Sequence, residues 1–203
     1  LVGRDITERE NAENLLLERL KFIEFINRIS SDLIKIDSDL IDDAILEALE
    51  SVAEFTKADR GYIFLLDRNR DVYSISYEAT INGVSKYTLE YPEFPMSDLY
   101  SLEDMLNQNR AYMREVDRDN LERLPDVIRP LMEKMGIKSF INLPLRVGNE
   151  LIGLLGFDRV TKNGLWSEEM VDYYLITASL LSSTIHRKKT INELIRSRER
   201  AIE

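Results

Sequence analysis

The sequence predicts a domain of the α+β class, with helices packed over an antiparallel sheet. Two apolar runs, Ser139–Val147 and Glu150–Val160, flank the turn residues Gly148 and Asn149. This pattern is typical of a tight hairpin, because Gly and Asn tolerate the positive φ that such turns require. Both runs are apolar at nearly every position rather than at alternate ones. We therefore expect both faces of their sheet to be covered.

Long helical patterns near both ends of the chain can supply one of these covers. Over residues 11–36 large apolar side chains recur every seven residues, and a second helix is expected over Ser38–Phe55 with Ser38 or Asp39 as its cap. A last helical pattern starts after the cap residue Ser167 and continues for about 36 residues, or roughly 54 Å. A domain of this size cannot cover that length, so the end of the helix should project.

About six strands are expected, with short helical inserts between them. Besides the hairpin, strand patterns occupy Gly61–Asp67, Val72–Thr80, Lys86–Tyr91 and Ala111–Val116. One insert helix should start at Ser97 or Ser101. Another falls within residues 117–136, where Pro130 removes a backbone donor and predicts a kink or two short pieces.

The composition excludes several classes of function. The chain has 203 residues and a formal net charge of −10, which would repel a nucleic-acid backbone. It has no cysteine, which excludes disulfides, thiolate metal sites, catalytic thiols and thioether-linked chromophores. The single histidine, His186, is interpreted as a surface or dimer-seam residue, with a haem ligand or pH switch as the alternative. No signal peptide or membrane-spanning run is found. We expect a cytoplasmic segment that binds no metal and contacts neither nucleic acid nor membrane.

The first residues resemble the closing motif of PAS sensor domains. Residues 1–4 could end a strand, and Asp5 or Thr7 could supply an N-cap oxygen for the helix that follows. Residues 5–9 match the Asp-Ile-Thr-x-Arg helix start of that family, in which the Asp and the Arg form a salt bridge. The resemblance implies that residues 1–20 are the end of a PAS domain and a connector helix.

The rest of the chain resembles the GAF sensor domain. The likeness is carried by Ala58–Leu65 (ADRGYIFL), Gly136–Ser139 (GIKS), Leu143–Leu145 (LPL), Gly153–Asp158 (GLLGFD) and Trp166–Glu169 (WSEE). It implies a GAF-like, PAS-related fold over residues 21–187, with the terminal helices on one sheet face and insert helices enclosing a small-molecule pocket on the other. Residues 188–203 would then form a signalling helix.

The same resemblance implies how such a domain would work. GAF domains usually form homodimers through their N- and C-terminal helices and relay changes to a kinase or cyclase module. The parent protein would be a sensor histidine kinase or a diguanylate cyclase, and this segment itself would be non-catalytic.

Departures from other GAF branches leave the cofactor unknown. Phytochrome-type GAF domains attach bilin through Cys, which this chain lacks. Cyclic-nucleotide GAF domains carry an Asn-Lys…Phe-x-x-x-Asp pattern after the last strand, whereas Asp158-Arg159 stands near that place here. Haem would need a usable axial ligand. The resemblance therefore argues against covalent bilin, cyclic nucleotides and haem.

Seven residues are candidates for contact with a small molecule, because aromatic walls with few polar groups suit such ligands. They are Phe64, Tyr77, Glu78, Met132, Phe140, Asn142 and Phe157. For each aromatic residue the alternative is ordinary core packing. Asn142 lies in an apolar strand, so it should face either a ligand or a structural hydrogen-bond partner. For Glu78 we favour a solvated strand end, and for Asp158 local hydrogen bonds that close its strand.

Two functions are compatible with these residues. The first is a sensory or relay domain that binds a small molecule or transmits a signal through a parallel dimer. The second is a structural dimerisation module whose pocket is filled by its own side chains. A small enzyme of GAF-like fold, such as a methionine sulfoxide reductase, would need cysteine nucleophiles that are absent here.

Overall fold

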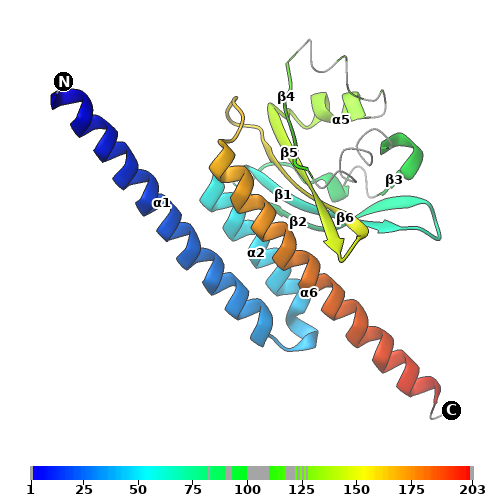
Figure 1. The fold of residues 1–203 in the computed structure, drawn as a ribbon. Helices are drawn as coiled ribbons and strands as arrows, with labels where there is room; N and C mark the ends of the chain where they lie inside the picture. Colours follow the sequence, from blue (N-terminus) through cyan, green and yellow to red (C-terminus); the bar gives the residue numbers. More distant parts are fainter. Residues whose placement is uncertain are drawn as a thin grey trace. The chain divides into compact units, whose positions relative to one another are not determined.

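The computed structural model describes residues 2–81, 83–89, 93–99, 110–117, 122, 124, 126 and 128–201 (Figure 1). The chain divides into two units, residues 1–36 and 37–203. Each unit is described by itself.

The first unit is a single helix, α1 (Val2–Lys35). This confirms the helical pattern predicted over residues 11–36. On its exposed surface, Arg9 and Glu13 form an ion pair of 2.9 Å one turn apart, a spacing that favours helix.

The strand end expected at residues 1–4 is wrong for the part described, because α1 already begins at Val2. The caps predicted at Asp5 and Thr7 are wrong for the same reason. Within the part of the chain that the structure describes, no strand pairs with these residues. An extended segment without such pairing has no hydrogen bonds to hold it, whereas a helix satisfies its own backbone. The identification of residues 1–20 with the end of a PAS domain stays a prediction.

The second unit opens with a 3₁₀ turn, η1 (Ser38–Leu40), which leads into α2 (Ile41–Thr56). The predicted helix is confirmed. Ser38 and Asp39, however, lie inside the 3₁₀ turn, and Leu40 stands at the N-cap position of α2. The buried face of α2 consists of Ile41, Ala44, Ile45, Ala48, Leu49, Val52, Ala53 and Thr56. The helix stops at Lys57, whose left-handed φ of 56° turns its N–H back toward carbonyls of the last turn.

In the described part of the chain, six antiparallel strands form one sheet in the order β3-β2-β1-β6-β5-β4, which confirms the α+β class. The strands are β1 (Arg60–Asp67), β2 (Val72–Thr80), β3 (Glu93–Pro95), β4 (Tyr112–Glu115), β5 (Ser139–Val147) and β6 (Glu150–Arg159). The predicted hairpin is β5–β6, with Gly148 at a φ of 58° in its turn. Both of its strands are interior, because β6 also pairs with β1 and β5 also pairs with β4.

One predicted strand is wrong. Over the described part of Lys86–Tyr91 the chain forms a 3₁₀ turn, η2 (Tyr87–Leu89), and the strand that borders β2 is β3, farther along. Glu78 of β2 supplies the physical reason. Its carboxylate accepts the backbone N–H groups of Tyr87 at 2.5 Å and Thr88 at 3.0 Å, donors that a strand would direct to its neighbour.

Helices α2 and α6 (Glu168–Arg200) lie side by side on one side of the sheet, which we call the helix face (Figure 1). Ser167 caps α6 as predicted, since its hydroxyl accepts the N–H of Met170 at 3.4 Å. Phe157 of β6 stacks on Tyr174 of α6 with ring centroids 4.4 Å apart. This packing is one of the two covers that the apolar hairpin required.

The other side of the sheet, the insert face, is covered by segments between the strands. Those described are η2, η3 (Met96–Leu99) and α5 (Ile128–Lys134). Pro130 lies in the first turn of α5, where helix N–H groups have no intrahelical acceptor in any case. Pro130 therefore does not interrupt α5. The alternative of two short pieces concerns residues 118–121, 123, 125 and 127 as well, which lie outside the described residues. The insert helix expected from Ser97 or Ser101 is a 3₁₀ turn over the described part, and residues 100–109 lie outside the described residues.

Candidate functional site

A β-bulge in β2 decides which of its side chains reach each face of the sheet. Ile63 of β1 pairs with Tyr77, while the next residue, Phe64, pairs with Ile75. Ser76 is thus an extra residue in β2. Directly paired residues on antiparallel strands share a face. Tyr77 therefore lies on the helix face with Ile63, and Ile75 lies on the insert face with Phe64.

The insert face carries an apolar cluster built from strands and inserts. Its buried members are Tyr62, Phe64, Tyr73, Tyr87, Phe94, Leu124, Leu131, Met132, Met135, Ile137, Phe140, Leu151 and Leu154. The ring of Tyr62 stands edge-on to those of Phe64 and Tyr87, at centroid distances of 5.5 and 5.2 Å. The described part of this face is therefore packed with the domain's own side chains.

A buried polar cluster adjoins these rings, and we call it the Arg60 cluster: Arg60, Glu78, Tyr87 and Asp158. Nη1 of Arg60 donates to Oδ2 of Asp158 at 3.0 Å, and its Nε lies 3.7 Å from Oε1 of Glu78. The Tyr87 hydroxyl donates to the same Asp158 oxygen at 2.7 Å, and its ring centroid lies 4.1 Å from the guanidinium carbon. Three strands and η2 thus each place one polar side chain at a single buried point.

One guanidinium faces two carboxylates in this cluster. Burial raises the pKa of Asp158 to about 6, although Arg60 and Tyr87 favour its charged form. Burial also holds the pKa of the Tyr87 phenol well above its usual range, so this hydroxyl stays a neutral donor. With both carboxylates ionised the cluster carries a net negative charge, and it therefore disfavours a further anion.

Three atoms of the Arg60 cluster are shielded from solvent without a hydrogen-bond partner among the described residues: Nε and Nη2 of Arg60 and Oδ1 of Asp158. Buried polar groups are nearly always paired, and an unpaired one destabilises a fold by about 1–3 kcal/mol. A small neutral molecule that both accepts and donates hydrogen bonds would satisfy these atoms.

Asn142 of β5 has a partner within the domain. Its Oδ1 accepts a hydrogen bond from the hydroxyl of Tyr62 at 3.0 Å, and both residues are buried. Of the two alternatives for this amide, the structure shows the structural hydrogen bond.

Five of the seven predicted site residues lie together on the insert face: Phe64, Glu78, Met132, Phe140 and Asn142. Glu78 is only 5% exposed, so the interpretation as a solvated strand end is wrong. The backbone of η2 and Arg60 occupy the positions around its carboxylate where solvent was expected.

The grouping of Tyr77 and Phe157 with the other five is wrong, because both lie on the helix face. The bulge at Ser76 moves Tyr77 there, and its hydroxyl donates to Asp42 of α2. Phe157 follows Gly156, which pairs with Tyr62, so strand alternation directs it to α6.

Sequence reasoning missed Arg60 and Tyr87, and it assigned Asp158 to local hydrogen bonds. Asp158 instead accepts from residues 98 and 71 positions away. A signal was present, since Arg60 and Asp158 are opposite charges at the ends of apolar runs and a buried charge requires a partner.

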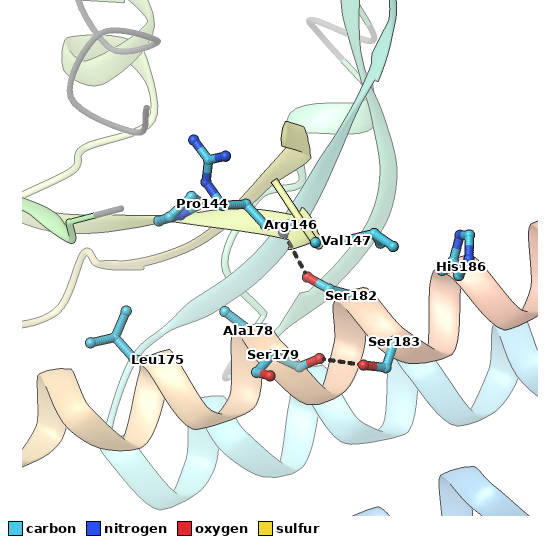
Figure 2. A pocket seen from close by; sticks show the side chains of 10 residues that line it. Pro144, Arg146, Val147, Leu175, Ala178, Ser179, Ser182, Ser183 and His186 are labelled. Carbon is cyan, nitrogen blue, oxygen red and sulfur yellow. Dashed lines mark hydrogen bonds between the residues drawn. The ribbon is translucent and has the colours of Figure 1, made fainter. Parts of the chain in front are cut away.

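A surface groove of about 610 Å³ lies between the end of the β5–β6 hairpin and α6 (Figure 2). Ser182 of α6 points to the hairpin, where its Oγ accepts the backbone N–H of Arg146 at 3.0 Å. His186 is exposed at one end of the groove, near Val147 (Figure 2). The helix wall carries Leu175, Ala178, Ser179, Ser182, Ser183 and His186. The Arg60 cluster is the stronger candidate site because it holds buried polar atoms without a hydrogen-bond partner among the described residues.

The described residues contain neither a cluster of metal ligands nor a membrane-spanning helix. No group of three or more His, Cys, Asp or Glu side chains there is arranged to hold a metal ion. Among the helices described, none combines the length and the apolar character needed to cross a bilayer.

The order of helices, sheet and inserts matches one protein family. The family model of the GAF domain matches residues 41–185, from the start of α2 to the last buried turn of α6. The chain belongs to the GAF domain family. The matched range includes every residue of the Arg60 cluster.

This GAF chain is similar to the methanogenesis regulatory histidine kinase FilI of Methanothrix harundinacea (strain 6Ac). The two are 25% identical over 206 residues, which cover 97% of this chain and 22% of the relative. The chain thus spans about a fifth of the length of the curated relative that it matches.

Solved structures of phytochromes share the fold. The phycocyanobilin-bound GAF domain from a cyanobacterial phytochrome has a TM-score of 0.66 at 16% identity, over 82% of this chain and 94% of that chain. The bacteriophytochrome RpBphP3 from R. palustris has a TM-score of 0.68 at 17% identity, over 90% of this chain and 40% of that chain. At these identities the likeness is one of fold alone.

Proposed function

We propose that this chain is a cytoplasmic, non-catalytic sensory or relay GAF domain of a histidine kinase or diguanylate cyclase. It binds a small molecule on the insert face or relays a signal through a parallel dimer of its terminal helices. The similarity to FilI, a histidine kinase, supports the kinase class for the parent protein. We assign residues 21–187 to the domain, residues 1–20 to the end of a PAS domain with its connector, and residues 188–203 to the signalling helix.

The observation that carries the sensory function is the set of unpaired buried atoms in the Arg60 cluster. The ring of Tyr87 lies against the Arg60 guanidinium, and Phe140 pairs with Asp158 across the sheet. Both aromatic residues belong to the apolar cluster of the insert face, and aromatic walls with few polar groups are the usual composition of a small-molecule site. The two carboxylates select against anions, so the ligand is a small neutral molecule with both acceptor and donor groups. Phe64, Glu78, Met132, Phe140 and Asn142 remain the proposed contact residues.

The relay function is supported by the course of α6. The helix is anchored on the sheet through Tyr174, Leu181 and Ile185, which are buried. It then continues to Arg200 with exposed apolar residues, among them Leu194 and Ile195. An apolar stripe on a projecting helix gains stability when a second copy covers it.

Native mass spectrometry of the purified chain tests the sensory function. We expect a bound mass in the wild type and in Arg70→Met, whose arginine forms an exposed ion pair with Glu93. The mass should be absent in Arg60→Met and in the milder variant Asp158→Asn. A wild-type chain without any bound mass would overturn ligand binding and favour the second function.

That second function is a structural dimerisation module whose pocket is filled by its own side chains. The packing of the described insert face, where Tyr62, Phe64 and Tyr87 contact one another, favours it.

Disulfide crosslinking tests the parallel dimer shared by both functions, because the chain has no cysteine of its own. Leu194→Cys should give covalent dimers under mild oxidation, since a parallel pair places the same residue of both copies together. Arg196→Cys, about 200° around the helix, is the matched control and should stay monomeric. Sedimentation of the wild type as a strict monomer, or equal crosslinking of both variants, would contradict this dimer.

A further inference from the structure

Two consecutive residues of β2, Tyr77 and Glu78, contact opposite sides of the domain. Tyr77 lies on the helix face, paired with Ile63, and Glu78 lies on the insert face, paired with Tyr62. Both are buried. The bulge residue Ser76 directly precedes them.

On the insert face, Glu78 fastens η2 to the sheet. Its two carboxylate oxygens accept the N–H groups of Tyr87 and Thr88, and one of them lies 3.7 Å from Nε of Arg60. Hydrogen bonds to an ionised acceptor are stronger than those between neutral groups. Glu78 is itself a member of the Arg60 cluster, so a rearrangement of that cluster also moves the Glu78 carboxylate.

On the helix face, Tyr77 takes part in a junction of three elements. Its hydroxyl donates to Oδ1 of Asp42 in α2 at 2.5 Å, and Nζ of Lys188 in α6 donates to both oxygens of the same carboxylate. Burial opposes ionisation of Asp42, but the hydrogen bonds from Lys188 and Tyr77 outweigh it and hold its pKa below the usual range. The junction is thus a charged, hydrogen-bonded tie between β2, α2 and α6.

The junction stands where α6 leaves the domain. Ile185 is the last buried residue of the helix, and Lys188 follows it by one turn. Beyond Lys188 the described residues of α6 are exposed or half-buried. The Tyr77–Asp42–Lys188 tie therefore helps to fix the direction in which the exposed end departs.

We propose that the Tyr77–Glu78 step couples the Arg60 cluster to the exit of α6. Release of η2 from Glu78 lets β2 rotate at the bulge, where the strand ladder is already interrupted. That rotation withdraws the Tyr77 hydroxyl from Asp42 and loosens Lys188. The coupling also acts in reverse, because linkage between two sites is reciprocal. It deepens the proposed relay function by naming the residues through which the insert face reaches the signalling helix.

Hydrogen exchange of the intact chain, read by mass spectrometry, tests this coupling. Glu78→Gln replaces an acceptor oxygen by an NH₂ group that faces a backbone N–H, so amides of residues 87–89 should exchange faster. The coupling predicts that amides 188–193 of α6 also exchange faster, by about tenfold, a typical size for coupling between sites. Asp42→Asn tests the opposite direction. This change on the helix face should speed amide exchange at Tyr87 and Thr88 on the insert face.

Two controls separate coupling from general loosening. Glu93→Gln removes the charge of Glu93 in β3, which forms an exposed ion pair with Arg70. It should change the exchange rates of neither residues 87–89 nor residues 188–193. Amides of Ile141 and Leu143 in β5, which β1 and β6 separate from β2, should keep their wild-type rates in every variant. Where Glu78→Gln does not fold, Tyr77→Phe removes a single hydroxyl and should still speed both segments.

Purely local effects of Glu78→Gln and Asp42→Asn would overturn the coupling. The proposed function has separate readouts, a bound mass and a crosslinked dimer, so its failure and the failure of the coupling are distinguishable. A crosslinked dimer with uncoupled exchange would leave the relay function in place and reject β2 as its route.

Discussion

Gly156 and Tyr62 lie directly opposite each other on β6 and β1, and the phenol ring crosses the glycine. A Cβ atom at position 156 would collide with Cε2 of Tyr62. The ring is held there by its hydrogen bond to Asn142 and by edge-on contacts with Phe64 and Tyr87. The second glycine of the GLLGFD motif therefore makes room for the ring at the centre of the insert face.

Gly156→Ala should lower the free energy of unfolding by about 1–3 kcal/mol, because a fixed ring cannot yield to the added methyl group. Chemical denaturation followed by circular dichroism measures the change. In a Tyr62→Ala background the same substitution should have little effect. An equal effect in both backgrounds would show that the close approach is not the cause.

Tyr62→Phe removes one hydroxyl and leaves the amide oxygen of Asn142 buried without its partner. We expect a loss of about 1–3 kcal/mol in the free energy of unfolding, the usual effect of an unsatisfied buried group. Adding Asn142→Leu to Tyr62→Phe should recover part of that loss, since both polar groups are then gone. If the double variant were as unstable as the sum of the two single ones, the Tyr62–Asn142 bond would not explain the effect.

Local patterns predicted much of this fold because the features concerned depend on neighbouring residues. The Gly148-Asn149 turn predicted the hairpin, and Ser167 predicted the start of α6. The heptad pattern predicted the helical character of α1, and the helix pattern of residues 38–55 predicted α2.

The features that escaped prediction depend on contacts between distant residues. No local signal marks Ser76 as a bulge, because the register of β2 is set by packing on β1. The turn η2 depends on Glu78, nine residues earlier. Arg60 and Asp158 meet only because β1 pairs with β6 across 98 residues. The sequence patterns therefore predicted aromatic side chains at the site, but they did not predict the buried charged pair of Arg60 and Asp158 beside them.

Ser167→Ala should lower the free energy of unfolding by about 0.5–2 kcal/mol, the usual effect of removing a helix cap. Ser167→Asp should retain most of the stability, because a carboxylate also accepts the Met170 N–H and suits the helix N-terminus. Ser183→Ala is the control on the same helix, since its exposed hydroxyl donates only to the carbonyl of Ser179. Fluorescence of the single tryptophan, Trp166, follows unfolding next to the cap. Equal losses for Ser167→Ala and Ser167→Asp would contradict a capping role.

Asp158 should make the domain less stable as pH rises through the mildly acid range. Its pKa is raised by burial to about 6 in the folded chain, against about 3.9 when unfolded. The folded state therefore binds more protons between these values, and its advantage is full below about pH 4 and lost above about pH 6. The stability difference between wild type and Asp158→Asn should fall over this window by up to about 3 kcal/mol.

Asp59 provides a matched comparison of opposite sign. Burial opposes its ionisation, but N–H groups of Thr161 and Val160 donate to it at 2.8 and 2.7 Å and hold its pKa below the usual range. Its contribution is present above the unfolded pKa and is lost as pH falls. In urea titrations from pH 3 to 7, Asp59→Asn should be most harmful at neutral pH, whereas the wild-type advantage over Asp158→Asn should be largest near pH 4. Parallel pH profiles for the two variants would show that the Arg60 cluster does not hold Asp158 in the environment described.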